Sequence, residues 1–350
     1  MTDLAVEKFS IGHDILFTIY STSSWALRDR VHSGKKLSGI IPPTAPKNFN
    51  DYRDFVYALA HRYRGKVAYY QIENEVYGAK QFWFGTEAEY FQLLETGSEA
   101  VRKADPDAKI LPASIALGEI DITSLPNDTR FRQGYDFLLK TYSVYAHCFD
   151  IADIHLYYTP EAIPDRLKWL KGIMISNNYE KPIWVTETGG LDPRAFSKKE
   201  YAHDNLKKQA VDIVKKYILC FANGAERVFY LSVQKNKDKE HPQFGNMRLT
   251  EDYKAEYKRP AYFSYKLMVQ KIGGFSSVSV IPCGYKFIVN GKPVLALWSE
   301  TEKTIDVSFF INKDEAVITS IITAKEKRDP LITKVASGIV TVSNIPIFVE

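Results

Sequence analysis

Strand-like and helix-like segments alternate along most of this chain, from about residue 14 to residue 272. Short apolar runs are each followed by a stretch with helical spacing of its apolar residues. Parallel strands need long crossover connections, which are usually helices, so this alternation predicts a parallel α/β sheet. Repetition on this scale favours a (β/α)8 barrel of the TIM type.

The expected strands fall into six runs, at residues 15–20, 67–75, 109–113, 151–157, 183–187 and 227–233. Helices are expected around residues 52–63, 86–97, 135–145, 165–176, 199–223 and 260–272. Thr86 with Glu89 forms a capping box, which marks the start of one of these helices. A closed barrel of this type has eight strands. We therefore expect an N-terminally incomplete barrel that lacks the first two βα units.

After residue 275 the pattern changes to short β-type runs without helices between them. Asn290-Gly291 separates two of these runs and is a strong hairpin signal. The runs lie at residues 277–281, 286–289, 294–298, 305–311, 317–323, 339–342 and 345–349. We expect a barrel domain over residues 1–275 and a small β-sandwich domain over residues 276–350.

Two short strings carry the chemical signal, namely residues 71–75 (Gln-Ile-Glu-Asn-Glu) and 184–189 (Trp-Val-Thr-Glu-Thr-Gly). Each places a glutamate, Glu75 or Glu187, at the end of an apolar run. Charges are rarely buried without a partner, so carboxylates at these positions indicate a function. In parallel barrels the reactive groups lie at the carboxyl ends of strands, and paired carboxylates there are typical of glycoside hydrolysis.

His155 and Tyr157 are two residues apart near the end of another expected strand, so they share one side of it. Together these strings resemble clan A glycoside hydrolases, most closely family 39, with similarity to families 5, 35 and 42. The resemblance rests on the Asn74-Glu75 pair, the 186–189 string and the 153–157 strand, and it covers most of the chain. The strings at residues 24–26 (Ser-Trp-Ala) and 104–109 (Ala-Asp-Pro-Asp-Ala-Lys) are similar as well.

The resemblance implies a role for each matching residue. Glu75 would be the general acid/base and Glu187 the nucleophile of a retaining, double-displacement mechanism. Asn74 would contact the sugar 2-hydroxyl, and either Tyr157 or His155 would hold Glu187 in place. The expected sugar-stacking residues are Trp25, Trp83 and Tyr230.

Two positions depart from the family pattern. Glu73 stands where an aromatic residue is common, and by strand parity it would face the same cleft as Glu75. Tyr230 stands near the end of an expected strand where the family often has a tryptophan.

The composition excludes several other classes of protein. The 350 residues carry a net charge of +4 with scattered basic residues, so we expect no nucleic-acid partner. No apolar run is long enough to span a bilayer. The three cysteines lack metal-site spacing, and no cofactor or metal is expected. Their odd number and the lack of a visible signal peptide favour a cytoplasmic location.

The expected partner is a carbohydrate, as an oligosaccharide, polysaccharide or glycoside. An oligomer or another protein that completes the barrel is an open alternative.

Two rival functions also stay open. One is a non-catalytic carbohydrate-binding relative or an inactive barrel fragment, which would not need a charged pair held close. The other is metal-assisted hydrolysis, which would need clustered histidines at several strand ends. The sequence names neither the sugar nor exo or endo action.

Overall fold

The computed structural model describes residues 2–21, 23, 25–26, 44–76, 83–116, 129–157, 159–189, 203–231, 248–250 and 257–350. The chain divides into two compact units. The first comprises Met1–His155 with Lys168–Thr186, and the second comprises Leu156–Leu167 with Glu187–Glu350. Among the described helices, none has the length and apolar character needed to cross a membrane.

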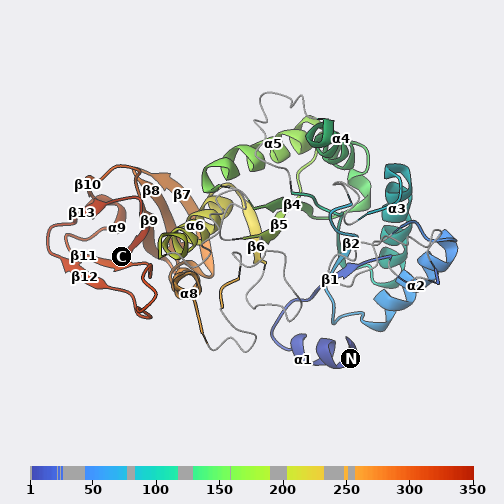
Figure 1. Ribbon diagram of the computed structural model, residues 1–350, viewed down its shortest axis with the longest axis horizontal. Coiled ribbons are helices and arrows are strands. Elements are labelled where there is room, and N and C mark those ends of the chain that lie inside the picture. Colours follow the sequence, from blue (N-terminus) through green and yellow to red (C-terminus); the bar gives the residue numbers. More distant parts are fainter. Residues whose placement is uncertain are drawn as a thin grey trace. The chain divides into compact units, whose positions relative to one another are not determined.

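Helices and strands alternate up to residue 230, as expected (Figure 1). The strands are β1 (Leu16–Ile19), β2 (Tyr69–Ile72), β3 (Lys109–Leu111), β4 (Ala152–Leu156), β5 (Ile183–Thr188) and β6 (Ala225–Tyr230). The helices are α1 (Thr2–Phe9), α2 (Phe49–Arg62), α3 (Glu87–Ala104), α4 (Thr129–Ser143), α5 (Ile163–Ser176), α6 (His203–Ala222) and α8 (Pro260–Ile272), with short 3-10 turns at Ala146–Cys148 and Pro160–Ala162. Residues 199–202 and 232–233, expected in a helix and a strand, lie outside the described residues.

In the first unit, β1, β2 and β3 form a parallel sheet in chain order, with Gln71 of β2 paired to Thr18 and to Leu111. An isolated parallel bridge between Ala116 and His155 continues the order to β4. The backbone N–H of Ala152 then donates to the carbonyl just before β5, at 2.8 Å.

In the second unit, the end of β5 joins β6 through a 2.9 Å hydrogen bond from the Leu231 N–H to the Thr188 carbonyl. The six strands therefore follow one another as the sequence predicts. Barrel closure, the two missing βα units and the domain boundary at residue 275 stay predictions.

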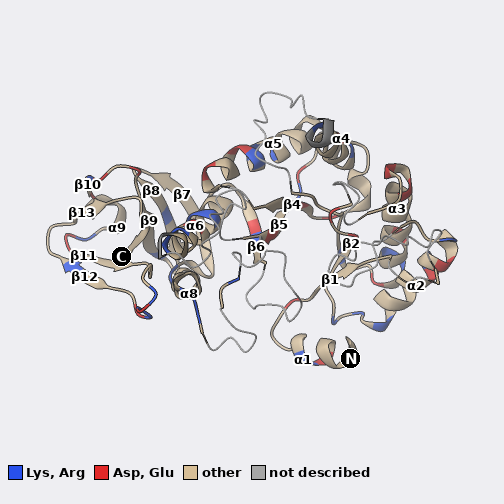
Figure 2. Ribbon diagram, in the orientation of Figure 1, with Lys and Arg blue, Asp and Glu red and all other residues tan. Residues whose placement is uncertain are grey.

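Helices α2 and α3 pack on the strands of the first unit. Gly97 of α3 permits this close approach, because a Cβ there would lie 3.0 Å from Ile72 of β2 and 3.1 Å from the Tyr52 hydroxyl of α2. Helix α3 begins with the predicted capping box of Thr86 and Glu89, which is confirmed. Both acidic and basic residues lie on α2 (Figure 2), whereas the basic residues of α3 are confined to its last turn.

The rest of the second unit is rich in β-strands, as the sequence predicts after residue 275. Strands β7 (Phe275–Ile281), β8 (Gly284–Val289), β9 (Lys292–Leu297), β11 (Ala316–Ser320), β12 (Ile332–Val335) and β14 (Ile347–Val349) form one antiparallel sheet in the order β12-β11-β14-β9-β8-β7. Strands β10 (Lys303–Asp306) and β13 (Ile339–Val342) form a second, two-stranded sheet.

The larger sheet is buried on both faces at strand β9. In β9, Val294 and Ala296 lie in one hydrophobic core with α6 and α8, while Leu295 and Leu297 lie in another with the β10–β13 sheet. The predicted hairpin joins β8 to β9, and Asn290 and Gly291 have φ values of 51° and 76°, as a tight turn of this kind requires.

One expected strand is wrong in part. Residues 305–311 were predicted as a β-type run, but β10 ends at Asp306 and a short helix, α9, covers Ser308–Ile311. The Asp306 carboxylate accepts the Ser308 N–H at 2.9 Å, and Asn312 ends the helix in the left-handed region with φ of 57°. These two local side-chain effects outweigh the β propensity of the apolar residues between them.

The capping box yields a stability prediction. Thr86→Ala removes the hydroxyl that accepts the Glu89 N–H, so we expect the free energy of unfolding to fall by about 1 kcal/mol. Chemical denaturation measures the change. Thr96→Ala on the same helix is the control, because the exposed Thr96 hydroxyl only donates to the Gln92 carbonyl, so a change within ~0.5 kcal/mol is expected. Equal losses in both variants would contradict a capping role.

Candidate active site

The Glu75 carboxylate is presented by a turn that follows β2. The strand ends at Ile72, and Glu73 and Glu75 have φ values of 63° and 45°, in the region that residues with a side chain rarely adopt. The Glu73 N–H donates to the Ile19 carbonyl at 3.0 Å, and the Glu75 N–H donates to the Ser114 carbonyl at 2.9 Å. These bonds hold a backbone whose strain is about 1–3 kcal/mol per residue.

Glu75 contacts a buried histidine. Its Oε1 atom lies 2.8 Å from Nδ1 of His155, which is fully buried in β4, while the Glu75 side chain keeps 16% of its surface exposed. The other ring nitrogen, Nε2, lies 3.2 Å from the hydroxyl of Thr186 in β5. The histidine therefore joins a carboxyl group that solvent can reach to a hydroxyl inside the protein.

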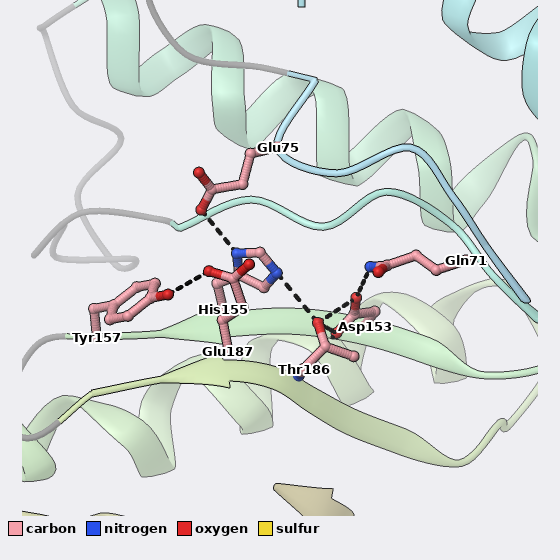
Figure 3. Close-up of polar contacts among 7 residues, drawn as sticks. All are labelled: Gln71, Glu75, Asp153, His155, Tyr157, Thr186 and Glu187. Atoms are coloured by element: carbon pink, nitrogen blue, oxygen red, sulfur yellow. Dashed lines mark hydrogen bonds and ion pairs between the residues drawn. The ribbon is translucent and has the colours of Figure 1, made fainter. Parts of the chain in front are cut away.

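From His155 the contacts continue through Thr186 to the buried carboxylate of Asp153 (Figure 3). The Thr186 hydroxyl lies 2.7 Å from both carboxylate oxygens of Asp153, which is fully buried in β4. The Gln71 amide donates to Asp153 at 2.7 Å, and the Thr18 hydroxyl donates to the Gln71 carbonyl oxygen at 2.9 Å. This chain of side chains, from Glu75 to Thr18, is the Asp153 relay.

In the second unit, Glu187 accepts a short hydrogen bond from the Tyr157 hydroxyl. The backbone on both sides of this pair is fixed by Lys216, a buried lysine of α6. Its ammonium donates to the Tyr157 carbonyl at 2.5 Å and to the Gly189 carbonyl at 2.6 Å. The Thr188 hydroxyl also donates to the Leu156 carbonyl. Tyr157 is therefore a residue that holds Glu187, while the bonds from His155 described above go to Glu75 and Thr186.

Glu73 does not follow the strand parity expected of it. It is fully buried, whereas Glu75 is partly exposed, because the positive φ values end the alternation at Ile72. One oxygen accepts the Ser21 N–H at 2.6 Å. Burial raises the pKa of Glu73 to about 7, and the hydrogen bond from Ser21 opposes that rise.

The expected sugar-binding residues have different surroundings. Asn74 is 9% exposed beside Glu75, and Trp25 is 75% exposed. Tyr230 lies at the end of β6 with its ring 6.1 Å from that of Tyr265.

Trp83, the fourth expected sugar-binding residue, is buried. It donates to the Thr86 carbonyl at 3.1 Å and packs on Tyr90, so its described contacts are those of a core residue. Substrate contacts by the first three stay predictions.

Four residues that contact the candidate site are not among the residues expected from the sequence, namely Gln71, Asp153, Thr186 and Lys216. Gln71 and Asp153 carry a signal, because each is a polar residue between apolar neighbours in its strand, whereas Thr186 stands beside Glu187 and is not singled out by its polarity. Lys216 gave no such signal, since a lysine in an amphipathic helix is usually solvated.

Potential metal ligands also gather away from these residues. Glu95, His147 and Cys148 place ligand atoms within 4.8 Å of one another. Burial raises the pKa of the Cys148 thiol to about 11, which disfavours the thiolate that binds metals. We assign no metal to this group.

Glu73 makes stability depend on pH. Its folded-state pKa is about 7 against an ordinary value of 4.5, so the folded state holds the proton more tightly. The unfolding free energy should fall by on the order of 3 kcal/mol as pH rises from about 4.5 through 7. Glu73→Gln should remove this loss and exceed the unsubstituted protein in stability above pH 7.

Chemical denaturation across that pH range checks the prediction. Glu226→Gln is the matched control, because Glu226 is an exposed glutamate of β6 and its substitution should leave the pH dependence unchanged. Parallel pH curves for Glu73→Gln and the unsubstituted protein would refute a proton on buried Glu73.

Neither protein-family models nor curated proteins match this sequence. Solved structures do match. A family 39 glycoside hydrolase from Bacteroides cellulosilyticus WH2 superposes with a TM-score of 0.66 at 15% identity, over 99% of this chain and 70% of its own. A family 39 β-xylosidase from Caulobacter crescentus gives 0.60 at 13%, over 96% and 78%. A family 44 xyloglucanase from Paenibacillus polymyxa gives 0.60 at 12%, over 99% and 82%.

At these identities the likeness concerns the fold. The chain is similar to α/β enzymes with a TIM-barrel-like part and a sheet-rich C-terminal part. The fold class predicted from the alternation of segments is confirmed at this level. The chain thus has the fold of glycoside hydrolases of families 39 and 44.

Proposed function

We propose that this chain is a retaining glycoside hydrolase that cleaves O-glycosidic bonds, with β-linked sugars as the preferred substrates. Glu75 is the general acid/base and Glu187 is the nucleophile. The observation that carries the proposal is that each glutamate lies at a strand end and is held by a residue from the end of β4. His155 contacts Glu75, and Tyr157 donates to Glu187.

The short sequence separation between the residues that contact Glu75 and those at Glu187 supports the use of both carboxylates on one sugar. Thr186, which contacts His155, is followed directly by Glu187 in the sequence. His155 and Tyr157 are separated by a single residue. In a retaining enzyme the two carboxyl groups lie about 5 to 5.5 Å apart, and the second acts as a nucleophile without an intervening water.

The reaction then has two steps. The Glu187 carboxylate attacks the anomeric carbon while the Glu75 carboxyl gives its proton to the leaving glycosidic oxygen, so a covalent glycosyl-enzyme forms. A water next loses a proton to Glu75 and attacks the same carbon, which releases Glu187. Tyr157 orients the nucleophile by its hydrogen bond, and Lys216 holds the backbone of Tyr157 and Gly189.

Substrate contacts follow from the same assignment. Asn74 precedes the acid/base and would hydrogen-bond the 2-hydroxyl of the sugar, a contact that strengthens in the transition state. Trp25 offers an exposed aromatic face, and Tyr230 offers a half-buried ring at the end of β6. The similar solved structures include a β-xylosidase and a xyloglucanase, which supports a carbohydrate substrate.

The first test is release of dinitrophenol from aryl xyloside, glucoside, galactoside, mannoside, fucoside and arabinoside. We expect turnover of at least one substrate, and its loss in Glu187→Gln, because glutamine keeps the side-chain volume but is not a nucleophile. Glu226→Gln, an exposed glutamate of β6, is the control and should keep full turnover. Turnover that persists in Glu187→Gln would exclude Glu187 as the nucleophile.

A second test separates the two roles. In Glu75→Ala we expect a rate loss of about 10²- to 10⁴-fold on substrates with poor leaving groups, which need the acid, and a smaller loss on dinitrophenyl substrates. Azide should partly restore turnover of the activated substrates, since a small nucleophile no longer needs the base. Equal losses on both substrate types, without rescue by azide, would rule out the acid/base assignment.

A further inference from the structure

The Asp153 relay constrains where protons lie around His155. The Thr186 hydroxyl has one proton and three close neighbours: the two Asp153 oxygens, both at 2.7 Å, and Nε2 of His155 at 3.2 Å. The proton can go to Asp153 or to His155, but not to both. Whether Asp153 accepts the Thr186 proton therefore decides which nitrogen of the His155 imidazole is protonated.

Asp153 is an acceptor on both oxygens. The Gln71 amide donates to Oδ2 at 2.7 Å, and the Thr186 backbone N–H donates to Oδ1 at 3.2 Å. The Thr18 hydroxyl donates to the Gln71 carbonyl oxygen, which fixes the direction of the amide. A buried carboxyl that receives a donor on each oxygen is stabilised in its charged form. The hydroxyl proton of Thr186 therefore goes to Asp153, and Thr186 can only accept from His155.

We propose that Asp153, acting through the Thr186 hydroxyl, fixes His155 as the tautomer with its proton on Nε2 and leaves Nδ1 as an acceptor for the Glu75 carboxyl proton. Asp153 and Thr186 are then positioning residues that act through His155. Nδ1 of this tautomer can only accept, so its 2.8 Å contact with Glu75 becomes a hydrogen bond that the carboxyl donates when it holds a proton.

The consequence for catalysis rests on the proposed function. The Nδ1 lone pair stabilises the protonated carboxyl that the first step needs. When Glu75 passes its proton to the leaving oxygen, its carboxylate faces that lone pair, and the resulting repulsion favours recovery of a proton from the attacking water. His155 keeps its Nε2 proton throughout, so each proton lost by Glu75 is replaced by one from water.

The test reads the imidazole directly by long-range ¹⁵N–¹H NMR of the full chain at neutral pH, with the signals of His155 identified by their loss in His155→Gln. We expect a protonated Nε2 and an unprotonated Nδ1. Thr186→Val removes the accepting oxygen, and Asp153→Asn offers the hydroxyl an N–H in place of an acceptor, so both should abolish this pattern. Thr186→Ser should restore it.

Thr141→Val is the matched control. It also removes a buried threonine hydroxyl, but one that donates to the Phe137 carbonyl in α4, so the His155 signals should not change. A protonated Nδ1 in the unsubstituted protein, as the other tautomer or as imidazolium, would overturn the proposal. An unchanged pattern in both Thr186→Val and Asp153→Asn would overturn it too.

Kinetics provide a second readout. Thr186→Val should slow hydrolysis about 10-fold or more on poor leaving groups, below the full 10²- to 10⁴-fold value of an acid/base, with little change on dinitrophenyl substrates. Equal slowing on both substrate types would contradict the positioning role. Absence of turnover in every protein would count against the proposed function alone, because the NMR pattern still decides the proton position.

Discussion

The buried carboxyl group of Asp153 is the constraint on which the candidate site depends. A fully buried carboxylate is costly unless its oxygens are satisfied, and the donors come from separate strands: Gln71 from β2 and Thr186 from β5. Thr18 of β1 is drawn in through Gln71, and the backbone N–H of Asp153 donates to the Tyr142 hydroxyl of α4. One buried carboxyl group thus contacts side chains of β2 and β5 and, through Thr186, the histidine that meets the candidate acid.

The polar residues and the strained backbone around the candidate site lower the stability of the fold while they hold the site side chains in place. Polar side chains occupy strand positions that apolar residues could fill, and Glu73 and Glu75 keep a strained backbone. Glu73 adds a buried carboxyl whose pKa of about 7 weakens the fold at higher pH. The strained backbone and the buried carboxyl both lie directly before or at Glu75. Local features that lower stability are expected at functional sites, so their position agrees with a functional role for Glu75.

Features governed by near neighbours in the sequence could be predicted from it. The capping box of α3, the stop of α8 before Gly273 and the Asn290-Gly291 turn depend on a few adjacent residues. The position of Glu187 within β5 also followed from the apolar run before it. The helix α9 is not predicted because the Asp306 carboxylate, which accepts the N–H of the first helical residue, competes locally with residues of high β propensity.

Features that depend on partners far along the chain could not be predicted. Gln71 and Asp153 are 82 residues apart, and only the fold brings their side chains together. The burial of Lys216 likewise depends on two backbone carbonyls from other strand ends. The parity of Glu73 failed for a different reason, since no pattern of side chains reports that the backbone turns left-handed after Ile72.

The two-sided burial of β9 has a consequence for how the C-terminal sheet finds its pairing. In a strand with one solvent-exposed face, a shift of the pairing register by one residue exposes the apolar side chains and is therefore unfavourable. In β9, Val294, Leu295, Ala296 and Leu297 are all apolar, so such a shift would still bury hydrophobic groups on both sides. Selection of the correct partner residues then falls to the tight turn at Asn290, whose backbone geometry permits only one alignment of the two strands that it joins.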